Sequence, residues 1–400
     1  MISTLQKTIK PVSAVRGLHK SAVEALKGPA PENTVTASYG KFISEVKPQH
    51  LSSVVLHRSK RMVLDSIGVG LIGSTTGVFE LALQHCKHTY APDDISSVYG
   101  RMGTRLSPTL AAFVNGVACS HALAIAASLS GAPMANAATQ SKPLHIGNAS
   151  RFGLEAALLA SRGLEASPLV LDAVAGVAGF NAFYEDYVPQ PLESPNDGGH
   201  MFLLEEQDMG FKRFPAHLGM HWVADAAASV HKLLVGFGPG TVSPAKVQKI
   251  ILRVPKSKYI DRPFPDSEHE ARHSFQFNAC SALLDGEVTV QSFSPVAMRR
   301  PDLLALLSRV HMEYPQDNPA NFNSMYGEIQ VTLVGGDILK GRCDTFYGHW
   351  RNPLTNESLR KKFRNNAGAV LLPEKVERLI DVVEELDRLE DCRTLLSQLY

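Results

Sequence analysis

The sequence has almost no excess of charge and few cysteines. Its 40 lysine and arginine residues balance 39 aspartate and glutamate residues, which leaves a formal charge of +1. So small a charge provides no general field to hold nucleic acid, and we expect no nucleic-acid partner. The five cysteines contain no C-x-x-C pair. This spacing argues against a disulfide framework, a zinc ribbon and a clustered iron–sulfur site.

Long hydrophobic runs are also lacking. The most apolar stretch, residues 110–138, is rich in alanine, glycine and serine and is interrupted by Asn115, His121 and Pro133. A bilayer span needs about 20 strongly apolar residues, so this stretch predicts a packed helical region and no membrane contact. Hydrophobic residues still make up 44% of the 400 residues. That length and composition are typical of a globular protein with two domains.

The N-terminal residues 1–35 differ from the rest of the chain. Up to Lys27 they contain five lysines and arginines but a single acid, Glu24, with serine and threonine between short apolar residues. This composition predicts a mitochondrial transit peptide, followed by a linker at residues 28–31. The alternative is a basic tail with no targeting role.

From residue 36 the apolar residues mostly follow helical spacing, and the pattern changes after the glycines of residues 236–240. Residues 247–254 are rich in β-branched side chains and predict a strand. Residues 326–334 alternate in polarity and lead into Gly335 and Gly336, which predicts a hairpin with a second strand over 337–343. The chain then returns to helical spacing after Pro373.

These patterns predict a mainly α fold. We expect a large all-helical domain formed by residues 36–207 together with 354–400. A smaller α+β lid domain, residues 208–353, would be inserted into it. The C-terminal helix is expected to pack back on the helical domain.

Two local patterns are candidates for chemistry. Lys142 precedes Pro143, which disfavours helical geometry and predicts a lysine on a loop between helices that could clamp a carboxylate. Lys212 lies five residues before His217, a combination suited to anion binding beside a group that titrates near neutral pH. His217 and His221 also have the spacing of a metal-binding pair, but no third ligand lies nearby. The alternatives are a solvated loop lysine and a structural junction.

A third pattern is the H-E-x-x-H sequence of residues 269–273. On a helix, two histidines at this spacing bind zinc and the glutamate acts as a base in metallopeptidases. No further histidine follows at a suitable spacing, and a rigid Pro-x-Pro loop precedes the motif. We therefore treat a zinc peptidase as a rival interpretation and expect no metal.

Four stretches together resemble one family. The resemblance is carried by residues 131–147, 211–230, 262–275 (RPFPDSEHEARHSF) and 344–351 (DTFYGHWR). It is a resemblance to the amino-acid sequences of the MmgE/PrpD family. The resemblance extends from about residue 41 to the C-terminus. It implies a helical domain with an α+β lid, a homodimer, and catalysis without metal or organic cofactor.

The resemblance also implies an activity and a site. It points to a lyase that decarboxylates cis-aconitate to itaconate, with Lys142, Lys212 and His217 as active-site residues and Tyr259 in substrate binding. Three substrate carboxylates require cations, and the carbanion left by decarboxylation must be stabilised and protonated. Arg213 is expected to brace the structure. A 2-methylcitrate-type dehydratase of the same family is the alternative.

The sequence departs from the family pattern after Ala118. Cys119, Ser120 and His121 lead almost directly into an alanine-rich stretch, where the family has an acid- and histidine-rich segment and further helices. The absent segment would carry an Asp, a Thr and two His of the family site, including the histidine usually assigned as proton donor. We therefore expect impaired catalysis, and an inactive isoform that only dimerises is a further alternative.

Overall fold

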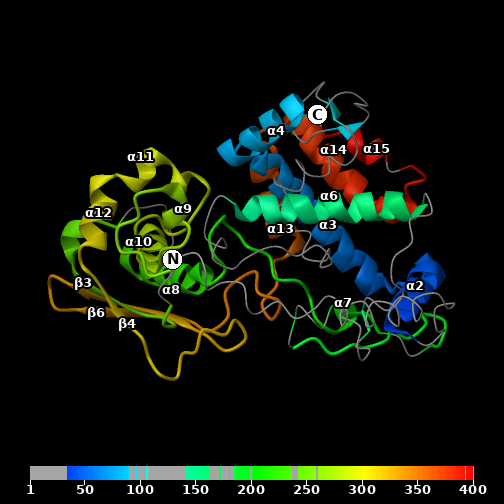
Figure 1. Ribbon diagram of the computed structural model, residues 1–400. Coiled ribbons are helices and arrows are strands. Elements are labelled where there is room, and N and C mark those ends of the chain that lie inside the picture. Colours follow the sequence, from blue (N-terminus) through cyan, green and yellow to red (C-terminus); the bar gives the residue numbers. More distant parts are fainter. Residues whose placement is uncertain are drawn as a thin grey trace, which may run out of the picture. The chain divides into compact units, whose positions relative to one another are not determined.

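The computed structural model describes residues 34–89, 96–97, 105–106, 141–161, 171–172, 180, 184, 186–198, 201–236, 242–257, 260–391 and 393–399. The α-helices are α2 (Val35–Glu45), α3 (Ser53–Gly73), α4 (Gly77–Thr89), α6 (Lys142–Ser161), α7 (Leu203–Glu206), α8 (Met220–Val235), α9 (Glu268–Ala271), α10 (Phe275–Asp285), α11 (Pro295–Met298), α12 (Pro301–Leu307), α13 (Asn356–Ala367), α14 (Pro373–Glu384) and α15 (Arg393–Leu396). The strands are β1 (Ser96–Ser97), β2 (Arg105–Leu106), β3 (Val247–Arg253), β4 (Val310–Glu313), β5 (Gly327–Leu333) and β6 (Ile338–Cys343), and Figure 1 labels most of these elements. Short 3₁₀ turns lie at Pro48–His50, Pro244–Lys246, Gln291–Phe293 and Leu386–Arg388.

These residues belong to two compact units. The first comprises the described parts of residues 1–56 and 154–206, and the second those of residues 57–153 and 207–400. In the first unit, the start of α2 is fixed by Asp172, whose Oδ1 accepts a hydrogen bond from the backbone N of Val35 at 2.7 Å. The Ser38 hydroxyl of the same helix accepts one from Leu192 N at 2.9 Å.

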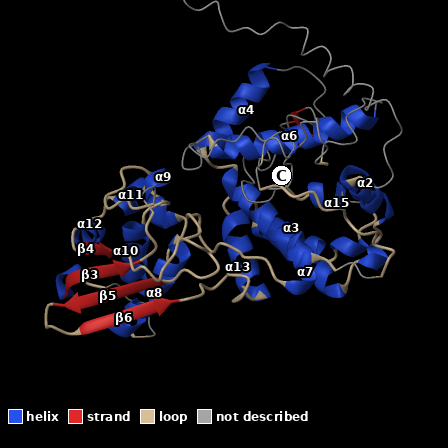
Figure 2. Cartoon of the chain, turned by 60° about the horizontal axis from the view of Figure 1, so that its bottom comes forward, coloured by secondary structure: helices blue, strands red, loops and turns tan. Residues whose placement is uncertain are grey.

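The second unit contains a four-stranded mixed sheet with the order β4-β3-β5-β6. β3 is parallel to β4 and antiparallel to β5, and β5 is antiparallel to β6 (Figure 2). The predicted strand at 247–254 and the predicted hairpin are confirmed. Gly336 has a φ of +91° in the hairpin turn, a conformation that residues with a Cβ rarely adopt.

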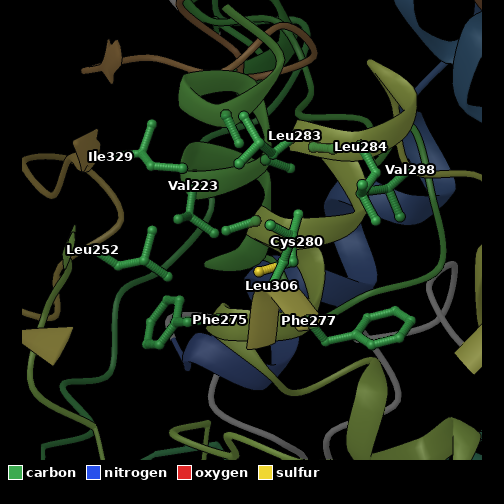
Figure 3. Packing of buried hydrophobic residues seen from close by; sticks show 14 of the residues in the cluster. Val223, Leu252, Phe275, Phe277, Cys280, Leu283, Leu284, Val288, Leu306 and Ile329 are labelled. Atoms are coloured by element: carbon green, nitrogen blue, oxygen red, sulfur yellow. The ribbon is translucent and has the colours of Figure 1, made fainter. Parts of the chain in front are cut away.

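The core of this unit lies between the sheet and the helices α8 and α10. Side chains from β3, β5, α8 and α10 interdigitate there, including Leu252, Ile329, Val223 and Phe275 (Figure 3). The sheet approaches α8 very closely, because a Cβ on Gly327 would lie 2.6 Å from the backbone of that helix. The buried side chains that alternate along β5 therefore pack directly against the apolar face of α8, so that the sheet and this helix form two packed layers.

A second hydrophobic cluster of the same unit joins α3, α13 and α14. Leu64, Phe363 and Leu379 are buried in it. The Thr355 hydroxyl caps α13 by accepting a hydrogen bond from Ser358 N at 3.2 Å. α14 begins at Pro373, and its apolar stripe packs against the other two helices, which confirms that the C-terminal helix returns to the helical part of the chain.

The expected fold class, a large helical domain with a smaller inserted α+β lid, is wrong. The chain is largely helical and contains the mixed sheet, but the sheet belongs to the same compact unit as α3, α4, α13 and α14. Phe211 and Tyr347, near the two ends of the predicted lid, both pack in the α3–α13–α14 cluster, Phe211 buried and Tyr347 partly buried. The change in sequence pattern marks a change of secondary structure, which does not by itself define a separate compact unit.

Among the described residues, no single helix is long and apolar enough to cross a bilayer. α3 and the Gly77–Cys86 part of α4 reach that length and composition only as a pair, bent by 82°.

Candidate active site

The segment before α8 carries Lys212 and His217, and backbone hydrogen bonds hold it at both ends. Phe211 N donates to Gly348 O at 2.6 Å, and His217 N donates to Arg272 O at 2.8 Å. The Phe211 side chain is buried, whereas Lys212 and His217 are only half-buried. This anchoring places both polar side chains beside the segment that contains Arg272.

His217 is held as a neutral imidazole. Its Nδ1 accepts a hydrogen bond from Gly219 N at 3.2 Å. Burial is the main reason that the pKa of His217 falls to about 3. Lys212, His273 and Lys142 lower this pKa further through their charges. At neutral pH the ring is therefore uncharged, with its proton on Nε2.

Lys212 lies among other cations. Burial is the main reason that its pKa falls to about 7, and the charges of Lys142, Lys362 and Arg272 act in the same direction. We refer to these four residues, Lys142, Lys212, Lys362 and Arg272, as the cationic cluster. An ammonium group that is half-buried among like charges is held at a free-energy cost, which an anionic ligand would reduce.

Two members of the cationic cluster have carboxylate partners. Glu268 pairs with Arg272, and Asp65 pairs with Lys362. Within the described part of the chain, no carboxylate pairs with the other two members. Counted over the described residues, the cluster is therefore under-neutralised, which suits a multiply charged anion.

Lys142 is the first residue of α6, so the prediction that it lies on a loop between helices is wrong. A proline at the second position of a helix is compatible with helical geometry, because the N–H that it lacks has no partner there in any case. The Lys142 side chain is exposed, yet its charge lowers the pKa values of Lys212, His217 and His273. The structure thus brings Lys142, Lys212 and His217 together. Tyr259, the fourth predicted residue, lies outside the described residues.

His273 belongs to the same group, and sequence reasoning assigned it a different role. Its ring centroid lies 5.7 Å from that of His217 and 4.7 Å from that of His269. Its Nδ1 lies 2.9 Å from the carbonyl oxygen of His269. Burial is the main reason that the pKa of His273 falls to about 4. The H-E-x-x-H pattern drew attention to this residue, but as a zinc ligand.

The structure does not support the zinc interpretation. α9 covers only Glu268–Ala271, so His269 and His273 do not share a longer helix. Glu270 pairs with Arg262 at 2.9 Å instead of facing a metal. In the ranges that the structure describes, no group of three His, Cys, Asp or Glu side chains is arranged to hold a metal ion.

The other histidine considered as a metal ligand points into the core. His221 is fully buried, and its ring stacks on Phe214 with a centroid separation of 4.0 Å. Nearby, Arg213 forms an ion pair with Asp225, whose second oxygen accepts a hydrogen bond from Tyr347 N at 2.9 Å. The guanidinium of Arg213 thus takes part in a structural ion pair with Asp225, as the bracing role predicts.

Comparison with known proteins gives two kinds of match. The model of the MmgE/PrpD C-terminal domain matches residues 214–388, and that of the N-terminal domain matches residues 38–121 and 118–190. Cis-aconitate decarboxylase from Mus musculus is 41% identical over 457 residues, which covers 90% of this chain and 92% of the mouse protein. Cis-aconitate decarboxylase from Homo sapiens is 41% identical over 461 residues, which covers 92% of this chain and 94% of the human protein.

These matches also locate a gap in this chain. The alignment with the mouse protein is longer than the 400 residues of the chain itself, so the relative has residues that this chain lacks. The N-terminal domain model matches in two pieces that meet at residues 118–121. This junction coincides with the point after Ala118 where the sequence departs from the family pattern.

Proposed function

Because the chain belongs to the MmgE/PrpD family, we propose that it is a carboxy-lyase that converts cis-aconitate to itaconate. The observation that carries this proposal is the 41% identity to two cis-aconitate decarboxylases over most of the chain. The under-neutralised cationic cluster beside His217 suits the same substrate, which carries three carboxylates.

Substrate binding is the first task of the cationic cluster. Lys142 and Lys212 each pair with a substrate carboxylate, and the Nε2–H of His217 donates a hydrogen bond to a third oxygen. The bound anion restores the charge of Lys212, whose pKa of about 7 leaves it only partly protonated in the free protein. Binding is therefore coupled to proton uptake.

Decarboxylation follows from the allylic position of the leaving group. The carboxylate on the methylene carbon leaves as carbon dioxide, and its bonding electron pair forms the new terminal double bond. The electrons of the old double bond move to the far carbon, next to a carboxylate, and this carbon takes a proton. Cations that surround the substrate stabilise the developing charge without having to reorganise. Protonation needs a positioned acid.

The gap after Ala118 bears on the rate. The relatives carry a segment at this point that the chain lacks. We expect this chain to form itaconate more slowly than a chain in which that segment is present. A rate equal to that of the mouse relative would show that the segment is not needed for catalysis.

Product analysis tests the proposal. The purified full chain is incubated with cis-aconitate and, in parallel, with 2-methylcitrate, and the products are measured by mass spectrometry. We expect itaconate from the first substrate, and Lys212→Met should abolish its formation whereas Lys361→Met, an exposed lysine of α13, should not. Dehydration of 2-methylcitrate without any itaconate would establish the dehydratase instead. A folded chain that transforms neither substrate would be the inactive isoform.

We further propose a mitochondrial homodimer that works without metal or organic cofactor. The basic, acid-poor composition of residues 1–35 supports the location. Fusion of these residues to a fluorescent protein, compared with a fusion in which the five basic residues are glutamines, tests it by microscopy. Light scattering of the purified chain tests the dimer, and a monomeric mass would refute it.

A further inference from the structure

The rings of His217 and His273 lie 5.7 Å apart and have opposite tautomers, and a backbone group sets each tautomer. The Nδ1 of His217 accepts a hydrogen bond from the backbone N–H of Gly219 at 3.2 Å, so the neutral ring carries its proton on Nε2. The Nδ1 of His273 lies 2.9 Å from the carbonyl oxygen of His269, which can only accept. The neutral His273 ring therefore carries its proton on Nδ1 and its lone pair on Nε2.

This difference decides which ring can take up a proton at low cost. To become an imidazolium, His217 must add a proton to Nδ1, where it would meet the N–H of Gly219. His273 adds its proton to Nε2 and keeps its hydrogen bond to His269. That hydrogen bond favours the charged ring and raises the pKa of His273, against the larger effect of burial.

We propose that His273 is the general acid of the decarboxylation and that His217 stays neutral and donates a hydrogen bond from Nε2. This inference rests on the proposed function. When carbon dioxide has left, the carbanion removes the proton from Nε2 of the His273 imidazolium, and a C–H bond forms on the carbon beside the carboxylate. His273 becomes neutral and is reprotonated by water, so one proton is consumed for each carbon dioxide released.

The positions of the two rings suit this division of roles. Their centroids lie 5.7 Å apart with the planes tilted by 43°, a separation at which both can contact one small molecule. Arg272 links their backbones, because its carbonyl oxygen accepts from His217 N and it directly precedes His273 in the chain. The positions of the two rings are therefore coupled.

Binding of the negatively charged substrate raises the pKa of His273 and so favours the protonated ring. In the free protein His273 is neutral at pH 7, since its pKa is about 4. Among the described residues, Lys142, Lys212, Arg262 and His269 are charged or titratable groups that act on the two rings. Arg262 is already paired with Glu270. A trianion bound to the two lysines removes their repulsion and adds negative charge, which raises the pKa of both rings, but the Gly219 contact opposes protonation of His217 alone.

Nitrogen NMR of the imidazole rings tests the proposal without any need for turnover. The full chain is labelled with ¹⁵N-histidine, and His217→Asn and His273→Asn assign the two rings. We expect an Nε2–H tautomer for His217 and an Nδ1–H tautomer for His273. Tricarballylate, a tricarboxylate that lacks the double bond, should convert His273 alone to the imidazolium.

Two NMR outcomes would overturn the proposal: reversed tautomers in the free protein, or an imidazolium at His217 with tricarballylate bound. A separate outcome bears on the proposed function. If the resonances of neither ring respond to tricarballylate or to cis-aconitate, the site does not bind tricarboxylates, whatever the tautomers are.

A substitution matched to the hydrogen bond tests the acid itself. In His273→Asn the amide can still donate to the His269 carbonyl from the place of Nδ1, but the Nε2 atom is gone. His311→Asn, on an exposed histidine of β4, is the control. We expect His273→Asn to lower kcat for itaconate about 10²-fold or more with a smaller change in KM, whereas the control stays near the wild-type value.

A stereochemical measurement shows whether His273→Asn is slow because the general acid is missing or because the site is distorted. In D₂O the wild-type protein should place deuterium on one face of the product methylene group. His273→Asn should give a mixture, because water then protonates the carbanion from either face, and added imidazole should restore part of the rate. Unchanged kcat in His273→Asn, or slow but fully stereospecific product, would overturn the proposal.

Discussion

Replacement of Lys212 by methionine should stabilise the protein while it destroys substrate binding. Methionine has a similar volume and no charge. The pKa of Lys212 falls from 10.5 to about 7 in the folded protein. Since one pH unit corresponds to about 1.4 kcal/mol, the charged form costs the fold up to about 5 kcal/mol.

The size of this effect depends on pH in a defined direction. Below pH 7 Lys212 is charged in both the folded and the unfolded chain, and the full penalty is present. As the pH rises above 7 the folded chain loses this proton first, and the penalty disappears towards pH 10.5. The gain in unfolding free energy from Lys212→Met should therefore fall from about 5 kcal/mol at pH 6 to about 2 kcal/mol at pH 9.

Urea denaturation followed by tryptophan fluorescence measures this difference at both pH values. Lys361→Met, at an exposed position of α13, is the matched control and should change the unfolding free energy by no more than about 0.5 kcal/mol. If Lys212→Met unfolds at the same or a lower urea concentration than wild type at pH 6, the ammonium group of Lys212 is not destabilised by partial burial among cations. The electrostatic basis of the site would then be wrong.

Three other predictions follow from the structure. Gly327→Ala should lower the unfolding free energy by about 1–3 kcal/mol in urea titrations, because its Cβ would lie 2.6 Å from the backbone of Trp222 and Val223. Gly335→Ala, where nothing lies within 4 Å, should leave stability nearly unchanged; equal losses would contradict the close packing of the sheet on α8. His217→Gln, which keeps an N–H donor, should retain about tenfold more itaconate-forming activity than His217→Ala; equal rates would argue against the donor role. Elemental analysis should find no stoichiometric zinc, and dialysis against a chelator should leave itaconate formation unchanged; zinc at one per chain would revive the peptidase interpretation.

Much of the local structure could be predicted from residue spacing. The β-branched run at 247–254 is β3, the paired glycines at 335–336 form the hairpin turn, and Pro373 begins α14. Each of these depends on neighbours within a few positions. β4 could not be predicted in this way, because it is short and pairs in parallel with β3, about sixty residues earlier in the chain.

The candidate site divides in the same way. Lys212 and His217 lie close together in the sequence and could be paired from their spacing. Lys142 can be selected from the proline that follows it, and the family resemblance adds that it shares a site with Lys212 and His217. The structure places it at the start of α6, because proline is compatible with the second position of a helix. His273 belongs to a motif whose usual meaning is zinc binding on one helix, whereas α9 ends at Ala271, before His273.

The sequence was enough for the family, for the strand at 247–254, the hairpin and the helix after Pro373, and for which side chains could carry a proton or a positive charge. These properties belong to single residues or to short stretches of chain. The folded arrangement was needed to show that Lys142 and Lys362 repel Lys212, and which nitrogen of the His217 and His273 rings bears the proton. Electrostatic interaction and hydrogen bonding act through space, so they depend on which distant segments the fold brings within a few ångströms.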